Sequence, residues 1–309
     1  MLAALAVACT PNYASQPAAV ERTIALTFDD ATLVDGPLFA GVERTERLIN
    51  ALSNAGVSEA MFFVTTGNVA LAGKSGSGRI KAYAAAGHAL GNHSHSHLWY
   101  WQTPTDDYIA DLDRAIDLLQ DYENVQPFYR FPFLDEGRSL DKRDAFREAL
   151  KARGLRNGYA TVDTYDWYLA DLTREAKTAG IGIDLEKLRD LYVDVISRST
   201  EFYDAMAQQS LGRSPHHVLL LHENDLAALF VGDLVAELQE RGFEIIPATE
   251  AFLDPIANRE PETLYLGQGR VAALAHESGW QAADLVSPTE NEDYLRRRFD
   301  DEVVKLPGQ

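Results

Sequence analysis

Short apolar runs alternate with longer amphipathic stretches along this chain from Thr23 onward. The runs are bounded by turn-forming residues, which is typical of strands. The stretches between them repeat apolar residues at helical spacing. The predicted strands are Thr23–Phe28, Glu59–Val64, His88–Gly91, Pro127–Phe131, Asn157–Val162, His217–Leu221 and Phe243–Ile246. The clearest predicted helices are Glu46–Ala55, Asp106–Tyr122 and Leu226–Arg241.

Seven strands that alternate with helices predict an α/β fold with a parallel sheet and the helices outside it. Either a barrel or an open doubly wound sheet fits this pattern. No glycine-rich phosphate loop follows the first strand, which weakens the nucleotide-binding version of the open sheet. The glycines of Ser75–Gly78 do not directly follow a strand, so this segment is predicted to be a flexible loop.

Composition narrows the class of protein. The 309 residues are 46% hydrophobic, which is ordinary for a globular enzyme. The net charge of −19 argues against nucleic-acid binding and against adhesion to anionic lipid. Neutral or cationic substrates are therefore expected.

The first residues are small and apolar and end at Cys9, the only cysteine, so no intrachain disulfide can form. They resemble the end of a secretory signal, and Ala6–Cys9 loosely resembles a lipoprotein cleavage box. Export to the periplasm or cell envelope is expected, with lipid anchoring through Cys9 as one form of it and a cytoplasmic location as the alternative. The run is too short to span a bilayer. The predicted division is a signal-like or linker segment at 1–19, a catalytic domain at 20–255 and a C-terminal extension at 256–309.

Polar residues stand out where the predicted strands end. They are Asp29, Asp30, His93, Arg130, Asp163, Asp166 and His222. In a β/α barrel these ends face one rim, where active sites lie. Residues far apart in sequence are therefore expected to converge there.

Two carboxylates at a strand end and two histidines four residues apart supply the parts of a divalent-metal hydrolase. One carboxylate and two imidazoles can hold the metal, and the other carboxylate is left to take a proton from the attacking water. Side chains alternate along an extended strand, so Asp30 is expected to face the metal and Asp29 the water. His93 and His97 would share a face if their segment were helical. His95 would then point elsewhere and is expected to play a supporting or surface role.

Five short motifs occur in order: Thr27–Asp30, His93–His97, Arg130–Phe133, Asp163–Trp167 and Leu220–His222. Each is modest alone, but together they are specific. From Thr23 to Leu253 the chain resembles the polysaccharide deacetylases of carbohydrate esterase family 4, the nodulation-type deacetylase domain. The resemblance implies a distorted (β/α)7 barrel with a helical insertion between the fifth and sixth strands, at about residues 170–213.

The resemblance also implies a role for each motif residue. Asp30, His93 and His97 would bind the metal, and Asp29 would be the catalytic base held by Arg130. His222 would be the general acid, oriented by Asp166. The backbone N–H of Phe133 would face the developing oxyanion, and Trp167 and Leu220 would wall the acetyl pocket, with Asp163 on the substrate side.

Three departures from the family pattern bear on the site. Five residues, 31–35, separate Asp30 from Gly36-Pro37, whereas the family usually continues directly, so this loop is longer. Phe133 stands where a tyrosine is usual, which removes a hydroxyl and keeps the backbone donor. The insertion, predicted as helices Leu185–Ile196 and Glu201–Gln209, is expected to form a lid or side wall, or else a stabilising element away from the site.

These features predict a metal-dependent hydrolase that deacetylates N-acetylhexosamine units, with zinc as the default metal and Co, Ni or Mn as alternatives. Hydrolysis of small amides, imides or O-acetyl esters is an alternative on the same barrel. A catalytically silent glycan-binding module is another. The expected partner is an acetylated glycan or a small amide. The glycan and the oligomeric state stay open, and in the extension only Glu290–Phe299 is predicted to be helical.

Overall fold

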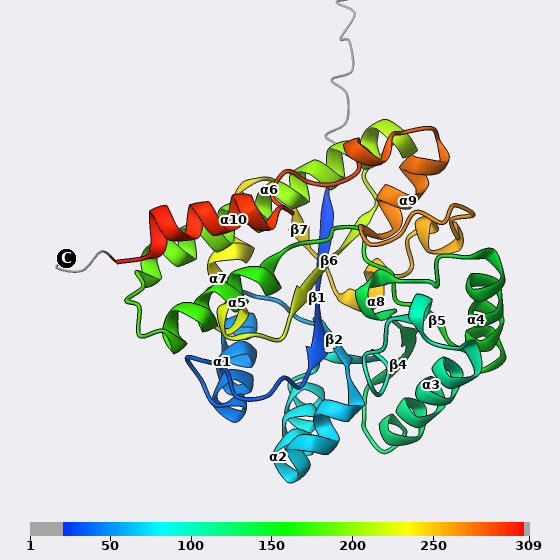
Figure 1. Cartoon of the computed structure of the whole chain (residues 1–309), viewed down its shortest axis with the longest axis horizontal. Coiled ribbons are helices and arrows are strands. Elements are labelled where there is room, and N and C mark those ends of the chain that lie inside the picture. Colours follow the sequence, from blue (N-terminus) through cyan, green and yellow to red (C-terminus); the bar gives the residue numbers. More distant parts are fainter. Residues whose placement is uncertain (1–20, 306–309) are drawn as a thin grey trace, which may run out of the picture.

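Seven parallel strands form the centre of the molecule in the computed structural model, which describes residues 21–305 (Figure 1). The strands are β1 (Thr23–Ala31), β2 (Met61–Val64), β3 (Ala89–Asn92), β4 (Val125–Tyr129), β5 (Arg156–Asn157), β6 (His216–His222) and β7 (Glu244–Ile245). The helices are α1 (Gly41–Asn54), α2 (Thr66–Ala85), α3 (Thr105–Leu119), α4 (Leu140–Ala152), α5 (Asp166–Thr178), α6 (Leu185–Leu211), α7 (Asp225–Glu240), α8 (Ala248–Ala251), α9 (Gly269–Glu277) and α10 (Glu292–Arg298). Every predicted strand is present, with its ends shifted by a few residues.

The sheet curls into an irregular barrel. Its order is β5-β4-β3-β2-β1-β6, and β7 pairs with the start of β1. The chain after β5 joins the two edges, because Gly158 N–H donates to the Tyr129 carbonyl of β4 at 2.7 Å and Val162 bridges to Leu219 of β6. The predicted fifth strand is thus a short strand followed by a single bridge. This confirms the distorted barrel and excludes the open doubly wound sheet.

Strand β1 runs through the centre of the core and is buried on both faces. Ile24, Ala25, Leu26 and Phe28 have no exposed surface. The strand pairs with β6 residue by residue from Thr23 opposite His216 to Asp29 opposite His222. This register places the acidic pair of β1 beside the histidine that ends β6.

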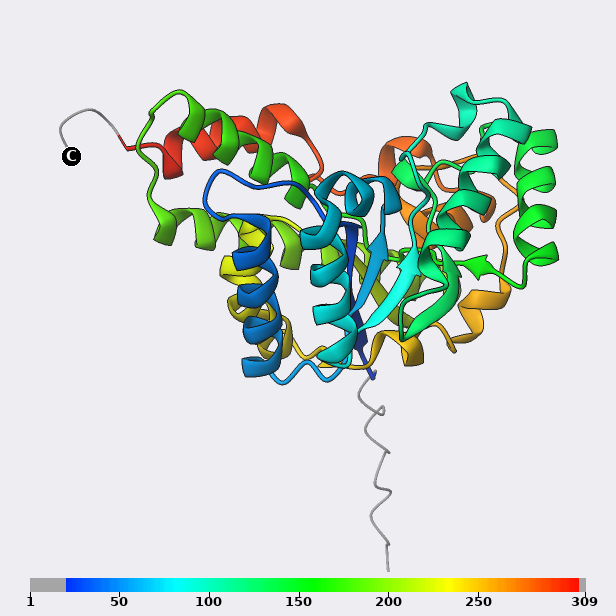
Figure 2. The same cartoon turned by 90° about the horizontal axis from the view of Figure 1, so that it is seen from below.

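Helices cover the outside of the barrel, with α1 and α7 packed together and α3 beside α4 (Figures 1 and 2). Helix α6 is one continuous helix of 27 residues rather than the two predicted segments. It packs on α7 and α9 and buries a long apolar face that includes Leu188, Tyr192 and Val195. The insertion therefore belongs to the outer helical layer, and the expectation of a lid is wrong for α6.

The C-terminal extension packs against the barrel. Helix α9 contacts α6, and α10 contacts α5 (Figure 2, orange and red). Helix α10 lies within the predicted helix Glu290–Phe299. Ser75–Gly78 was expected to be a loop but lies inside α2, whose backbone is interrupted at Gly73. The glycines of this segment therefore lie in a kinked helix and not in a loop that connects two elements.

The signal-like segment with Cys9 lies outside the described residues. Within 21–305, no helix has the length and apolar character needed to cross a bilayer.

Candidate metal centre and active site

A cavity of about 610 Å³ opens where the strands end, and most of the predicted site residues line it. The predicted residues on its wall are Asp29, Asp30, His93, His97, Phe133, Asp163, Trp167, Leu220 and His222. Arg130 and Asp166 have no exposed surface and contact Asp29 and His222 directly. All eleven predicted residues therefore belong to one site.

Asp30, His93 and His97 form a group that could hold a metal ion. Their ligand atoms lie within 4.8 Å of one another. Asp30 Oδ1 is 3.3 Å from His97 Nε2 and 3.9 Å from His93 Nε2. His93 Nδ1 is 2.9 Å from the Arg130 carbonyl, and as the donor there it leaves Nε2 free as a ligand. One carboxylate and two neutral imidazoles are a donor set that suits zinc.

Local backbone geometry, not regular secondary structure, brings these ligands together. Asp30 has φ of +63°, so β1 is not extended at this residue. The expected alternation of Asp29 and Asp30 is therefore wrong: His93 Nε2 is 3.7 Å from Asp29 Oδ2 and 3.9 Å from Asp30 Oδ1. The histidine segment is a loop rather than a helix, and Ser94 and His97 also have positive φ.

His95 is turned away from this group. Its Nδ1 is 2.9 Å from the Thr66 hydroxyl, and its backbone N–H donates to Asp111 at 2.8 Å. The residue is nearly buried and fixes the loop on which the two ligand histidines stand.

Arg130 holds the Asp29 carboxylate. Its Nη1 donates to Asp29 Oδ1 at 2.8 Å and to the Thr27 hydroxyl at 2.7 Å. Its Nε donates to the Gly158 carbonyl at 2.6 Å. The guanidinium lies over the ring of Phe63 at 4.0 Å. This fully buried guanidinium fixes the position of the Asp29 carboxylate, where it is placed to act as a base.

His222 is paired with Asp166 at the end of β6, beside the acidic pair of β1. His222 Nδ1 is 2.8 Å from Asp166 Oδ1, and the backbone N–H of His222 donates to Asp166 Oδ2 at 2.9 Å. The Asn224 amide donates to the same oxygen at 3.0 Å. The imidazole is therefore oriented by a buried carboxylate, with its Nε2 left for substrate.

His93 and His222 differ in charge, because their surroundings shift their pKa values in opposite directions. Burial, together with the charge of nearby His97, lowers the pKa of His93 to about 3. Burial also lowers the pKa of His222, but Asp166 and the acidic pair of β1 outweigh it and raise the value to about 9. For Asp30, burial raises the pKa, yet His97, His93 and His222 bring it below its usual range. His93 is thus neutral, as a ligand must be, and His222 carries a proton, as an acid must.

Asp163 lies on the cavity wall, and its Oδ1 accepts the Thr164 N–H at 2.9 Å. Burial raises the pKa of Asp163 to about 7. This carboxyl is therefore partly protonated near neutral pH and can donate as well as accept.

Other residues of the cavity wall were not predicted. Trp99 stacks on Phe133 with ring centroids 3.8 Å apart, and Arg138 lies beyond it. Leu266, Gly267, Gln268 and Glu292 come from the C-terminal extension. Trp99 could have been predicted, because it lies two positions after the ligand histidine His97. The four residues of the extension belong to no recognisable sequence motif and could not.

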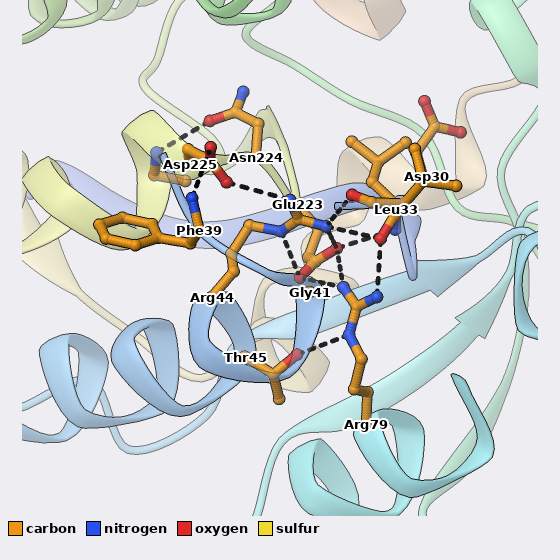
Figure 3. A network of polar contacts seen from close by, with 12 residues as sticks. Asp30, Leu33, Phe39, Gly41, Arg44, Thr45, Arg79, Glu223, Asn224 and Asp225 are labelled. Carbon is orange, nitrogen blue, oxygen red and sulfur yellow. Dashed lines mark hydrogen bonds and ion pairs between the residues drawn. The ribbon is translucent and has the colours of Figure 1, made fainter. Parts of the chain in front are cut away.

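A network of buried charges lies under the loop that follows Asp30 (Figure 3). Arg44 donates to Glu223 at 3.1 Å and to Asp225 at 3.0 Å. Arg79 donates to both oxygens of Glu223 at 2.8 Å. Leu33 N–H also donates to Glu223, at 2.9 Å. Two positive and two negative groups balance, so burial is tolerated.

Comparison with known proteins supports the resemblance that the sequence motifs indicate. Residues 17–157 match the family model described as polysaccharide deacetylase. A polysaccharide deacetylase from Bacillus cereus has the same fold, with a TM-score of 0.52 and 19% identity over 74% of this chain and 92% of that one. A family 4 carbohydrate esterase pseudoenzyme from Bacillus anthracis gives 0.50 and 16% identity over 75% of this chain and 65% of its own. No curated protein sequence matches significantly. The segment that matches the polysaccharide deacetylase model carries the first three of the five motifs, and the barrel brings all five to one rim.

Proposed function

We propose that this chain is a zinc-dependent hydrolase that removes acetyl groups from N-acetylhexosamine units of a poly- or oligosaccharide. The observation that carries the proposal is the arrangement around one cavity of a metal-ligand triad, a carboxylate held by arginine and an imidazole held by aspartate. Co, Ni or Mn would also suit the donor set. A glycan substrate would suit the export that the first nine residues predict.

A metal bound by Asp30, His93 and His97 would polarise the substrate carbonyl and the attacking water. Asp29, held in place by Arg130, takes the proton from that water. The backbone N–H of Phe133 donates to the oxyanion as the carbonyl carbon becomes tetrahedral.

An amine leaves poorly unless it is protonated, so the second half of the reaction needs an acid. His222 supplies that proton from Nε2, and Asp166 holds the ring and stabilises its charged form. Its raised pKa of about 9 keeps the proton in place at neutral pH. Trp167 and Leu220 exclude water around the acyl group.

The size of the site supports a glycan over a small amide. The catalytic cavity is about 610 Å³, and α6 does not cover it, because none of the residues on its wall comes from 185–211. A closed pocket would have favoured small amides or imides. The space fits more than a lone acetamide group.

The experiment is incubation of the zinc-loaded protein with N-acetylglucosamine oligomers, O-acetylated glycans and small amides, with released acetate and free amine measured. The Asp29→Asn variant is the matched control, because it keeps the metal ligands. Acetate and amine released together from oligomers by the native chain alone would support the proposal. Acetate without amine would assign O-deacetylation, and binding without any release would assign a silent glycan-binding module.

A further inference from the structure

The two histidines of the metal-ligand triad are held in different ways. His93 Nδ1 is 2.9 Å from the Arg130 carbonyl, and this hydrogen bond fixes the direction of its ring. The backbone N–H of His97 donates to Ser94 Oγ at 2.9 Å, but within residues 21–305 the Nδ1 of its ring has no hydrogen-bond partner. The His97 ring must therefore be oriented by packing.

This packing comes from an aromatic stack that leads from the triad to the surface. The rings of His97 and Phe133 meet edge to face, with centroids 4.6 Å apart and planes at 67°. The indole of Trp99 lies nearly parallel to the Phe133 ring, with centroids 3.8 Å apart and planes at 10°. Both arrangements are favourable for aromatic pairs. Phe133 has no hydroxyl, so packing alone holds its ring as well.

The same stack bears on the backbone of Phe133. The φ angles of Phe133 and Leu134 are +58° and +49°, in a region that residues other than glycine seldom adopt. Such a conformation persists only where the surroundings fix it. The direction of the Phe133 N–H, which is assigned to the oxyanion, therefore depends on what holds the Phe133 side chain.

Trp99 is carried by a turn that hydrogen bonds hold in place. It directly precedes the short helical turn Tyr100–Gln102. Lys142 Nζ donates to the carbonyls of Tyr100 at 2.7 Å and Thr103 at 2.6 Å. The Thr103 hydroxyl donates to the Trp99 carbonyl at 2.8 Å. The backbone of Trp99 is thus fixed, although its side chain is partly exposed.

We propose that Trp99 is a positioning residue, which orients the metal ligand His97 and the oxyanion donor Phe133 through one aromatic stack. The inference rests on the proposed function, because it takes the roles of these two residues from it. A partly exposed indole outside the five motifs would then set both the metal affinity and the rate of the chemical step.

Three variants test the stack. Trp99→Ala removes it, and Trp99→Phe keeps an aromatic ring in it. Trp101→Ala is the matched control, because Trp101 lies in the same turn, is similarly exposed and does not line the catalytic cavity. For each protein, the Kd for zinc is measured by competition with a chelating dye, and kcat and KM are measured with the N-acetylglucosamine tetramer at saturating zinc.

Trp99→Ala should bind zinc roughly tenfold more weakly, at the lower end of the effect of losing an outer contact of a metal ligand. Its kcat should fall about tenfold at a nearly unchanged KM, because the oxyanion donor acts in the transition state. Trp99→Phe should recover both values to within about threefold of the native chain. Trp101→Ala should stay within about twofold, as most surface substitutions do.

Equal zinc affinity in Trp99→Ala and Trp101→Ala would overturn the proposal. A raised KM at unchanged kcat would also overturn it and make Trp99 a substrate contact, and a loss that Trp99→Phe does not recover would reject the stack as its cause. Should Trp99→Ala fail to fold by circular dichroism, Trp99→Leu takes its place, because it keeps apolar bulk without a flat ring.

The zinc measurements also separate this proposal from the proposed function. If no acetylated substrate is hydrolysed, weaker zinc binding in Trp99→Ala that Trp99→Phe restores would keep the positioning of His97 and reject the activity. Unchanged zinc binding would reject the positioning role, whether or not the native chain is a deacetylase.

Discussion

Neutralising Glu223 tests the buried network directly. Glu223 has no exposed surface and accepts hydrogen bonds from Arg44, Arg79 and Tyr83. Glu223→Gln keeps the shape but leaves two buried guanidinium groups facing the single carboxylate of Asp225. Loss of one partner from a buried ion pair typically costs about 3–5 kcal/mol. We expect a loss of that size in the free energy of unfolding, which corresponds to a fall in Tm on the order of 10 °C.

The chain contains a matched control of the same chemistry. Glu43 and Arg47 form an ion pair at 2.8 Å on the surface of α1, where both side chains are 48% exposed. Screening by water limits such pairs to roughly 0.2–1 kcal/mol, so Glu43→Gln should change stability little.

Urea unfolding followed by circular dichroism, at one pH and one zinc concentration, compares the two variants. A double variant, Glu223→Gln with Arg79→Met, should recover part of the loss, because the excess positive charge is removed. If Glu223→Gln cost no more than Glu43→Gln, the reasoning from burial and charge balance would be refuted.

Four further predictions concern the catalytic site. His93→Ala should abolish tight zinc binding while His95→Gln retains it, measured by elemental analysis after dialysis, and equal loss in both would contradict the triad. Asp29→Asn should keep zinc but lower turnover by roughly 10²-fold or more in steady-state assays, the scale of a lost general base, so near-normal turnover would remove it from the mechanism. His222→Ala should slow amide cleavage far more than cleavage of an activated aryl acetate, which needs no proton on its leaving group, and equal losses would place the acid elsewhere. In the metal-free protein His222 should titrate near pH 9 by NMR, because Asp166 raises its pKa. The raised pKa stabilises the folded protein below about pH 6.5, and this stabilisation is lost as the pH rises through 9. Asp166→Asn should lower the pKa of His222, and an unchanged pKa would contradict the pairing.

Much of the barrel and the site could be predicted from sequence, because buried strands are short apolar runs and their polar ends are easy to see. The exceptions are local. The positive φ of Asp30 removes the side-chain alternation expected of a strand, so that both carboxylates face His93. A sequence pattern with period two cannot predict this change.

The buried network was invisible for a different reason. Arg44 lies on the inner face of α1 among apolar residues, and arginine at such a position is usually exposed. Its partner Glu223 is 179 residues away in sequence, so no local pattern links the two. The same distance problem hides Leu266 and Glu292, which join the cavity through packing of the C-terminal extension.

That packing changes what counts as the smallest active piece of this protein. Residues 260–305 complete a wall of the cavity and cover the apolar face of α6 through α9. A truncated protein that ends near residue 255, after the last motif, would therefore lack part of the cavity wall. It would also expose the apolar face of α6 to solvent, which favours aggregation. If the proposed activity holds, engineering of its substrate range can start from the extension, where substitutions change the cavity wall without touching any residue of the five motifs.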